Sequence, residues 1–541
     1  MQNVDAYIQK IHSSLHGSGP VNVSLFVNDH MLLQPVLHSK LSTKEVDIAA
    51  LTYSLLRLPF QVLQSKHLFL GQSDRVMEKA GIDLNSKDWD HVEALARARK
   101  CRYKASKKHL ALFIASNTDV EDIVTNLTAI YIELVKLHAK SNSGTALEDS
   151  FVNREDFDKL QEILGDHLSQ FADLVKKPID WKVQLLAGSQ MDYSRTVQQW
   201  WINIASSRKK VPVNVYDQPI YFVSSNSHSL INVLSGFPLY KKSFIEKIAK
   251  QRLEEQRQAF EDEGVPPENV LYYLSRFANK KEQYRRELKD FEKKYGLYRI
   301  APYHNIDIEG QVFSIKDFIK NPHMDPRLKI SAAQKKQLLK SNALIVNIAY
   351  PLGMASYHIL KEVSENAEEV RGVYITGKAA ALNANIGDIT IPHYVYDHHF
   401  DNEIFVHNDF NKDTFKSYMQ KQSVLDAQKA VTVRGTYLQN VESLQADFAA
   451  GRTIVEMEAG PYLERLYEMI YPERHPQNST FVVNPDIRLG MAYYVSDTPY
   501  RSEVNLGIKR LTWEGLNGTY GISLGIVQDI LNVECSRHGK K

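Results

Sequence analysis

Two acidic segments near the C-terminus carry side chains that could do acid–base chemistry. In the first, an apolar run delivers Ser496 and Asp497, Pro499 makes the turn rigid, and Glu503 lies four residues beyond the proline. A carboxyl group in a desolvated cleft can keep its proton near neutral pH and act as a general acid. Asp497 is therefore a candidate proton donor, and an aspartate that caps the turn after a strand is the ordinary alternative.

The second acidic segment places Glu456, Met457 and Glu458 at the end of another apolar strand. An unpaired carboxylate is costly to bury. A carboxylate here is therefore either neutralised by its neighbours or accepts hydrogen bonds from two hydroxyl groups of a ligand. A buried, salt-bridged glutamate is the alternative interpretation of Glu458.

Two glycine turns end apolar strands upstream of these segments. The first leads through Gly353 into a predicted helix, whose open N-terminal amides can hold an anion or a sugar hydroxyl. The second follows Thr376 and Gly377, and Lys378 and a helix-like stretch come after it. Ligands usually lie at the carboxyl ends of strands in α/β sheets, but simple turn geometry would explain both glycines equally well.

The order and spacing of these four segments resemble the nucleoside phosphorylase/nucleosidase superfamily, and within it the bacterial AMP nucleosidases. The similarity rests on a Val-Asn-Ile strand with a glycine turn, a strand end that leads to Gly-Asp, a Met-Glu segment, and Val-Ser-Asp-X-Pro followed by a glutamate. Arg434-Gly-Thr and the strand that leads to His228 add weaker similarity. The resemblance covers roughly residues 212–535, and the first ~200 residues match no motif.

The resemblance implies cleavage of the N-glycosidic bond of a purine nucleoside or nucleotide, by hydrolysis to the base and ribose or ribose 5-phosphate. It implies that Asp497 protonates the purine at N7 and that Glu458 accepts hydrogen bonds from the ribose hydroxyls. The other implied substrate-binding residues are Met457, Thr376, Gly377, Gly353, Ser496, Arg434, Lys378, His228 and Glu503. No organic cofactor or metal is implied, and a homo-oligomer is expected because superfamily members assemble as dimers, trimers or hexamers.

Departures from the family pattern keep other functions open. Lys378 and Ala379 replace a glycine pair, and His228 stands where the family usually offers an arginine to phosphate. The missing arginine favours hydrolysis over phosphorolysis by inorganic phosphate, which remains an alternative. A protein that keeps the fold and binds a nucleotide without turning it over is a second alternative, because fold does not fix function. A scaffold whose N-terminal half binds another protein is a third.

The elements around the motifs predict two domains. Residues 1–205 read as a mainly helical domain, since stretches such as 43–63 and 118–140 carry apolar residues at three- and four-residue spacing. One short strand is predicted over 21–27. From 206 to 541, strands alternate with helices, which predicts a nucleoside-phosphorylase-like α/β domain with a mixed, mostly parallel sheet flanked by helices.

A charged stretch interrupts the predicted α/β domain. Residues 241–298 are rich in Glu, Lys and Arg, and Pro266 and Pro267 cannot continue a helix interior. We therefore expect an exposed helical hairpin, broken at the prolines, which could serve as an interface or lid.

Composition excludes some functional classes. The chain of 541 residues has 66 Lys+Arg and 64 Asp+Glu, a net charge of +2, and this balance argues against a protein that coats nucleic acid. The basic run 97–108 is interpreted as a solvated helix face, and His398-His399 as a polar loop without the spacing of a zinc site. Two cysteines, no signal peptide and no apolar run of ~20 residues favour a cytoplasmic protein without a membrane span.

Overall fold

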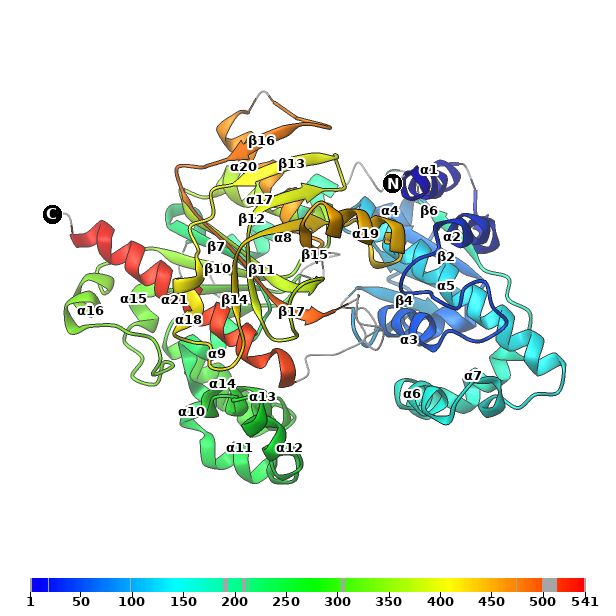
Figure 1. The fold of residues 1–541 in the computed structure, drawn as a ribbon, viewed down its shortest axis with the longest axis horizontal. Helices are drawn as coiled ribbons and strands as arrows, with labels where there is room; N and C mark the ends of the chain where they lie inside the picture. The colour runs from blue at the N-terminus through cyan, green and yellow to red at the C-terminus, as the bar shows by residue number, and fades with distance from the viewer. Residues whose placement is uncertain are drawn as a thin grey trace.

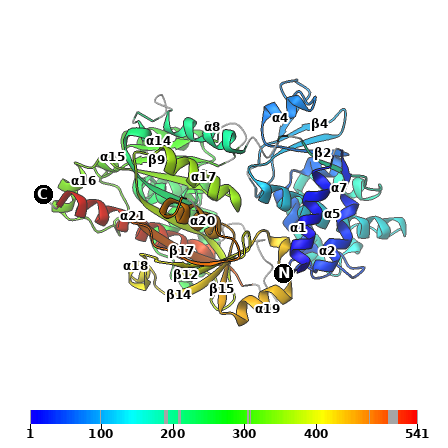
Figure 2. The same cartoon turned by 90° about the horizontal axis from the view of Figure 1, so that it is seen from above.

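The computed structural model describes residues 2–17, 19–97, 99–186, 188, 193–206, 211–212, 214–302, 306, 308–472, 474–498 and 513–539. Across these residues the strands form two separate sheets, one of six strands in the N-terminal part and one of eleven strands in the rest. Figure 1 and Figure 2 show the two parts side by side, with the blue and cyan N-terminal elements at one end of the molecule.

The smaller sheet is built from short strands with helices packed around it. Its order is β1-β6-β2-β5-β4-β3, with β2 parallel to β5 and β6 and the other pairs antiparallel. The strands are β1 (Val21–Asn22), β2 (His67–Gly71), β3 (Asp90–Val92), β4 (Cys101–Lys104), β5 (His109–Phe113) and β6 (Lys182–Leu185). The helices are α1 (Gln2–Leu15), α2 (Val27–Leu33), α3 (Ile48–Arg57), α4 (Asp74–Lys79), α5 (Asn117–Asn142), α6 (Arg154–Leu164) and α7 (Leu168–Val175).

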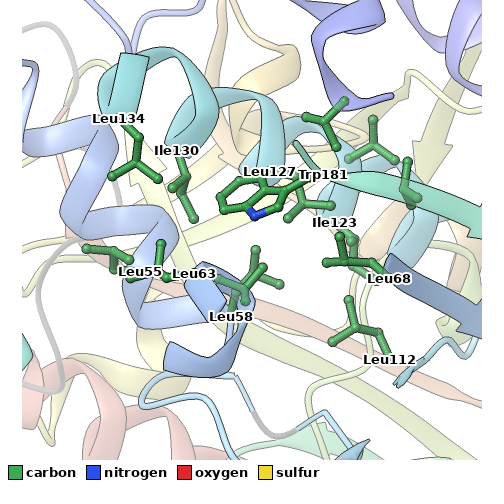
Figure 3. Packing of buried hydrophobic residues seen from close by; sticks show 14 of the residues in the cluster. Leu55, Leu58, Leu63, Leu68, Leu112, Ile123, Leu127, Ile130, Leu134 and Trp181 are labelled. Carbon is green, nitrogen blue, oxygen red and sulfur yellow. The ribbon is translucent and has the colours of Figure 1, made fainter. Parts of the chain in front are cut away.

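Helix α5 is the centre of this part. Its 26 residues present Ile123, Leu127, Ile130 and Leu134 to a buried cluster that includes Trp181 (Figure 3). Each large apolar side chain that is fully buried contributes about 1.5–3 kcal/mol. The packing around α5 is therefore a main source of stability for the N-terminal part.

The sequence predicted the helices of this part but missed its sheet. Helix α3 lies within the stretch 43–63 and α5 spans the whole of 118–140, as expected. The strand predicted over 21–27 covers only β1, and Val23–Phe26 is a 3₁₀ helix. The other strands have three to five residues, too few to establish a two-residue period, so the sequence did not predict the sheet of this mainly helical part.

Helix α8 (Tyr193–Ala205) packs on the larger sheet, although the predicted boundary assigned it to the N-terminal domain. Trp200 and Trp201 are buried in the core of the larger part, and the indole Nε1 of Trp200 donates to the carbonyl of Ile308 at 2.9 Å. We propose that the boundary between the two parts lies between β6 and α8.

The larger sheet is mixed. Its order is β16-β13-β12-β14-β15-β11-β7-β10-β9-β8, and β17 pairs with both β11 and β12. Strand β7 runs parallel to β10 and β11, and β11 runs parallel to β17. The strands are β7 (Pro219–Ser225), β8 (Leu297–Ile300), β9 (Gly310–Ser314), β10 (Leu344–Ala349), β11 (Glu369–Ala381), β12 (Ile389–Asp397), β13 (Asn402–Val406), β14 (Val424–Thr432), β15 (Arg452–Glu456), β16 (Thr480–Val483) and β17 (Arg488–Asp497).

Helices cover both faces of this sheet, which confirms the predicted class, an α/β fold with a mixed sheet flanked by helices. Helices α8, α17 (Met354–Asn366) and α20 (Ala459–Ile470) pack on one face, and α9 (Ser229–Ser235) and α21 (Leu516–Gly539) pack on the other. Successive residues of β7 alternate between the two cores, Ile220 and Phe222 in one and Tyr221 and Val223 in the other. The remaining helices are α10 (Phe237–Tyr240), α15 (Ile315–Phe318), α16 (Ala332–Leu338), α18 (Lys412–Lys416) and α19 (Val441–Ala449).

One prediction about β11 is wrong. The stretch after Lys378 is not helical, because β11 continues to Ala381. Beyond Gly377 the strand still pairs with β17, and Ala380 pairs antiparallel with Val455 of β15. Pairing with β17 and β15 thus keeps this alanine-rich sequence extended, although alanine prefers a helix.

The charged segment 241–298 forms four helices rather than a two-helix hairpin. They are α11 (Lys242–Ile248), α12 (Lys250–Asp262), α13 (Pro267–Ala278) and α14 (Glu282–Lys294), and β8 follows. The prolines do end the helical run, since Pro267 begins α13. Within the described part of the chain, none of the helices has the length and hydropathy that crossing a membrane requires.

The two parts contact each other through a shared cluster around Tyr437. Its ring packs among buried residues of both parts, and its hydroxyl donates to the carbonyl of Ala50 at 2.8 Å. The hydroxyl of Tyr53 donates to Thr436 at 2.6 Å, and Pro35 forms a β-bridge with Asn440. Apolar packing and hydrogen bonds therefore fix the larger sheet against α2, α3 and α5.

Candidate functional site

A cavity of about 410 Å³ lies at the carboxyl ends of β10, β11, β15 and β17, where the larger sheet meets the N-terminal part. Small-molecule sites typically have volumes of roughly 300–1,000 Å³. The larger part lines this cavity with Tyr350, Gly377, Lys378, Glu456, Met457, Glu458, Ser496 and Asp497. The N-terminal part lines it with Tyr53, Arg57, Arg97, Arg99, Phe113, Asp119 and Asp122. Both parts of the chain therefore build one site, which we call the interdomain pocket.

The end of β17 brings Asp497 into the interdomain pocket. Strand β17 runs parallel to β11, and a shift in register after Ala379 places Asp497 opposite Ala380. The Asp497 side chain is 6% exposed, and the hydroxyl of Ser496 donates to its Oδ2 at 2.6 Å. A buried carboxyl group beside a hydroxyl donor is thus fixed at the pocket wall.

The end of β15 separates the roles of two glutamates. Glu456 is 2% exposed, and its carboxylate accepts from the hydroxyl of Thr432 and from the amides of Glu458 at 2.7 Å and Ala459 at 2.8 Å. Those bonds hold the turn into α20. Glu456 thus holds the turn in place. Glu458, two residues further along the chain, lines the pocket.

Three charged side chains influence one another inside the pocket. Burial, followed by the charge of Glu456, raises the pKa of Glu458. Burial lowers the pKa of Lys378, whereas the charges of Asp497 and Glu458 act to raise it. Among the described residues Lys378 makes no side-chain hydrogen bond or ion pair, so its ammonium group is available to a ligand.

Arginines from the N-terminal part form the opposite wall. Arg99 is 6% exposed and pairs with Asp119 at 2.7 Å and with Asp122 at 3.0 Å. Its Nη1 is buried and has no partner within the described residues. Arg97 pairs with Asp119 at 3.2 Å, and the guanidinium of Arg57 lies 3.4 Å from the ring centroid of Tyr53. This wall offers positive charge to an anionic ligand.

The interpretation of the run 97–108 as a solvated helix face is wrong. Arg97 and Arg99 lie in an irregular segment before β4, and residues 101–108 form β4 and the turn that leads to β5. Lys100 pairs with Asp74 at 3.2 Å and Lys104 pairs with Asp88 at 3.0 Å. The basic run itself was the signal that could have identified Arg97 and Arg99 as ligand-binding candidates. Its spacing does not show that these first two arginines line the pocket and the later basic residues do not.

The turn after β10 contributes an aromatic wall that motif spacing did not predict. Tyr350 lines the interdomain pocket, and burial raises the pKa of its phenol. It lies beside Asn226 and Thr376, whose side chains oppose part of that rise. Thr376 is buried at 6% exposure and supports Tyr350, and Gly377 forms part of the wall.

Gly353 contacts the N-terminal part and does not line the described pocket. Its φ is +50°, and a Cβ at this position would lie 2.5 Å from Oγ1 of Thr118. The same Oγ1 accepts from the amide of Met354 at 3.2 Å. The start of α17 is therefore occupied by Thr118, so the predicted open helix N-terminus is wrong.

Arg434 lies away from the pocket wall and ties the two parts together. Its guanidinium bonds both carboxylate oxygens of Glu121, with distances of 2.5 and 3.2 Å. Glu121, which is 1% exposed, also pairs with His12 at 2.8 Å. The structure thus places Arg434 in an ion pair between the two parts, and Arg434 does not line the interdomain pocket.

The remaining predicted site residues lie elsewhere. His228 lines a second cavity, and burial, together with the charge of Arg299, lowers its pKa to about 4. Glu503 lies outside the described residues. His398 and His399 lie in the turn between β12 and β13, as expected of a polar loop, and the Nδ1 of His399 lies 2.7 Å from Oδ1 of the buried Asp397. In the described ranges, no group of three or more His, Cys, Asp or Glu side chains could hold a metal ion.

Comparisons with known proteins give one family match and several distant structural matches. A protein-family model described as "Family of unknown function (DUF6909)" matches residues 23–532. The search of the curated proteins found no match.

Two nucleosidases and a phosphorylase homologue are among the similar solved structures. The 5′-methylthioadenosine/S-adenosyl homocysteine nucleosidase of Campylobacter jejuni is 12% identical over 58% of this chain and 98% of its own, with a TM-score of 0.30. A putative methylthioadenosine nucleosidase from Weissella paramesenteroides is 12% identical over 44% and 89%, with a TM-score of 0.29. The P. knowlesi homologue of P. falciparum PNP is 10% identical over 59% and 92%, with a TM-score of 0.28. At these identities and TM-scores the overlays carry no inference about substrate, so function has to be inferred from the pocket.

Proposed function

Because this chain belongs to DUF6909, a family of unknown function, we propose its function from the interdomain pocket: hydrolysis of the N-glycosidic bond of a purine nucleoside or, preferably, of its 5′-phosphate. One observation carries the proposal. Met457 and Glu458 at the end of β15, and Ser496 and Asp497 at the end of β17, line the same cavity together with Lys378. In the sequence the two pairs are almost forty residues apart, and the fold brings them together.

The two carboxyl groups have different tasks in this proposal. Asp497 transfers a proton to N7 of the purine, which takes up the electron pair of the breaking C1′–N9 bond. Water adds its oxygen to C1′ and gives up a proton to the solvent, from which Asp497 is reprotonated, so that the products are the free base and the sugar with a new hydroxyl group. Glu458 accepts hydrogen bonds from the ribose hydroxyls through its carboxyl oxygens and so holds the sugar in place. Acid catalysis of this kind typically contributes about 10²–10⁴-fold.

Positive charge from both parts of the chain favours a nucleotide over a nucleoside. Lys378 has no partner among the described residues, and Nη1 of Arg99 is buried without one. A phosphate group offers several acceptor oxygens to such donors, and charge-assisted bonds of this type are the stronger ones. The opposite wall of Arg57 and Arg97 adds to the positive potential. The resemblance also motivates the remaining parts of the proposal, an AMP nucleosidase-like specificity, a homo-oligomer and a cytoplasmic location.

Base release tests the proposal directly. The full-length protein is incubated with AMP, adenosine, inosine and guanosine, with and without inorganic phosphate, and free base is followed by chromatography. Release that does not depend on phosphate is the expected result. Release only with phosphate would replace hydrolysis by phosphorolysis. If no base is released from any substrate and the protein still binds a nucleotide, the protein binds nucleotides without turning them over, and the proposal of hydrolysis is wrong.

Lys378→Met tests the phosphate assignment. We expect the KM for the nucleoside monophosphate to rise about 10–100-fold, because one charge-assisted bond worth about 1.5–3 kcal/mol is lost. The KM for the matching nucleoside should change little. Lys336→Met, which removes an exposed lysine from α16, is the control. Equal losses for nucleoside and nucleotide would contradict the assignment of Lys378 to the phosphate.

A further inference from the structure

A second cavity, of about 870 Å³, lies under the helical segment 241–298. Helices α13 and α14, strand β8, the turn between β7 and α9, and the start of α21 line it. It shares no lining residue with the interdomain pocket. We call it the α14 cavity.

One face of α14 supplies a row of positive charges to this cavity. Arg285, Lys289 and Lys293 are spaced four residues apart and all line it. At a rise of about 1.5 Å per residue, the row extends over about 12 Å. Among the described residues none of the three makes an ion pair or a side-chain hydrogen bond. Unpaired cations at this spacing leave a positive strip along the cavity wall.

The acidic charge in the α14 cavity is already neutralised. Glu292 is the acidic residue among those that line it, and it is 3% exposed. Arg299 bonds both of its carboxylate oxygens, with Nη2–Oε1 at 2.8 Å and Nε–Oε2 at 2.9 Å. The positive strip on α14 therefore has no internal counterion in the described part of the cavity.

Buried polar atoms face the same space without partners. Tyr284 is 2% exposed, and its hydroxyl has no hydrogen-bond partner within the described residues. The same holds for Nε2 of His228. Buried polar side-chain atoms are usually hydrogen-bonded, and each exception calls for an explanation. A ligand that accepts hydrogen bonds in this cavity would satisfy both atoms.

We infer that the α14 cavity binds a small molecule that carries two or more phosphate groups. A chain of phosphates matches a row of cations spread over about 12 Å better than a single anion does, because each group can pair with its own cation. The cavity's volume lies within the roughly 300–1,000 Å³ of small-molecule sites. Tyr272, Tyr273 and Leu516 line its interior, which suits an additional ring or apolar body on the ligand.

Titration calorimetry with inorganic tripolyphosphate and the full-length protein tests this inference. The expected result is one-to-one binding that Lys289→Glu combined with Lys293→Glu weakens by at least about tenfold. Arg286→Glu combined with Lys294→Glu is the matched control, since it makes the same charge change on the same helix at positions that do not line the cavity. Equal weakening in both pairs would mean non-specific attraction and would overturn the inference, as would the absence of binding to the wild-type protein.

Tyr284→Phe tests the interior of the cavity independently of net charge. The hydroxyl has no partner in the structure, so thermal unfolding should be unchanged while tripolyphosphate binding weakens several-fold. Undiminished binding by this variant together with undiminished binding by the Lys289/Lys293 pair would overturn the inference. A nucleoside triphosphate serves as the second probe. Tighter binding of the nucleoside triphosphate than of tripolyphosphate would place its ring in the tyrosine-lined interior. Equal binding of the two would mean that the cavity recognises the phosphate chain alone.

Discussion

Asp497 and Glu458 reach the interdomain pocket from two different strands, and their surroundings differ. Ser496 donates to Asp497, whereas Glu458 lies near the buried carboxylate of Glu456. Two acidic groups in unlike environments are suited to unlike tasks, one as a proton donor and one as a hydrogen-bond acceptor. Each task can be tested by a substitution that keeps the shape of the side chain.

Asp497→Asn should lower kcat for base release by about 10²–10⁴-fold, because the amide cannot transfer a proton to the purine. The KM should change much less, since the amide keeps the size of the carboxyl group. Steady-state kinetics with AMP measure both constants. Asp166→Asn, at an exposed aspartate of the N-terminal part, is the control. A variant of Asp497 with wild-type kcat would exclude it as the donor.

Glu458→Gln should change how stability depends on pH. Burial raises the pKa of Glu458 in the folded protein, so the folded state holds a proton that the unfolded state has released. Its contribution to the unfolding free energy is therefore lost as pH rises through the raised value. The glutamine stays neutral, so the variant should gain stability relative to wild type between about pH 5 and about pH 8. Urea unfolding at both pH values measures the difference, and Glu162→Gln, at an exposed site, should show none.

At the residue scale, motif spacing predicted Met457, Glu458, Ser496, Asp497, Gly377 and Lys378, all of which line one pocket. Those residues lie near or just beyond the carboxyl ends of buried strands, so sheet geometry brings them to one edge. Arg434 and Gly353 were predicted for the same pocket but contact Glu121 and Thr118 instead. No local pattern could show this, because both partners belong to α5, more than 200 residues away in the sequence.

Among the elements, the junction between α5 and α17 depends on the absence of a side chain. Gly353 has φ +50° and ψ −122°, and Thr118 of α5 occupies the space of its missing Cβ. Gly165 has nearly the same conformation, φ +48° and ψ −125°, with open space around it. Alanine substitutions at the two glycines therefore separate the cost of backbone strain, which both share, from the cost of a steric conflict, which only Gly353 has.

Gly353→Ala should destabilise the protein more than Gly165→Ala does. Strain at a left-handed position costs about 1–3 kcal/mol in either variant, and only Gly353→Ala also forces α17 away from Thr118. Adding Thr118→Ala should restore part of the loss, because it removes the two atoms nearest to the new methyl group. Denaturant unfolding measures all three. Equal losses of unfolding free energy in the two glycine variants would show that the contact with Thr118 adds nothing to the cost of Gly353→Ala.

The elements that the sequence predicted are those with long buried runs. The sequence predicts strands over 211–225, 343–350, 370–377 and 388–397, which contain β7, β10 and β12 and the middle of β11, and α17 follows Gly353 as expected. The short strands of the N-terminal sheet were missed because β3 has three residues and β4 has four. Strands of that length are specified by their neighbours in the sheet, and a two-residue period cannot be recognised in them.

For the whole molecule, the ion pair of Arg434 and Glu121 is the clearest link between the two parts. Arg434→Met should cost about 1–3 kcal/mol of stability, because it leaves the buried Glu121 with His12 as its remaining side-chain partner. Nucleotide affinity should fall as well, since both parts line the interdomain pocket. Adding Glu121→Gln should recover much of the stability. Arg257→Met, at an exposed arginine of α12, should change neither quantity. Unaltered affinity in Arg434→Met would show that the pocket does not need this link.

Glu534 of α21 has a consequence for how the protein is made. It is fully buried, accepts from Tyr221 of β7 at 2.8 Å and from Ser341 at 2.7 Å, and pairs with Arg371 of β11 at 2.9 Å. Chains emerge from the ribosome N-terminal end first. Strand β7 must therefore wait for more than 300 further residues before Tyr221 gains this partner. Throughout that interval the nascent sheet exposes the face that α21 later covers, so a chaperone that binds this face during translation should raise the yield of folded protein.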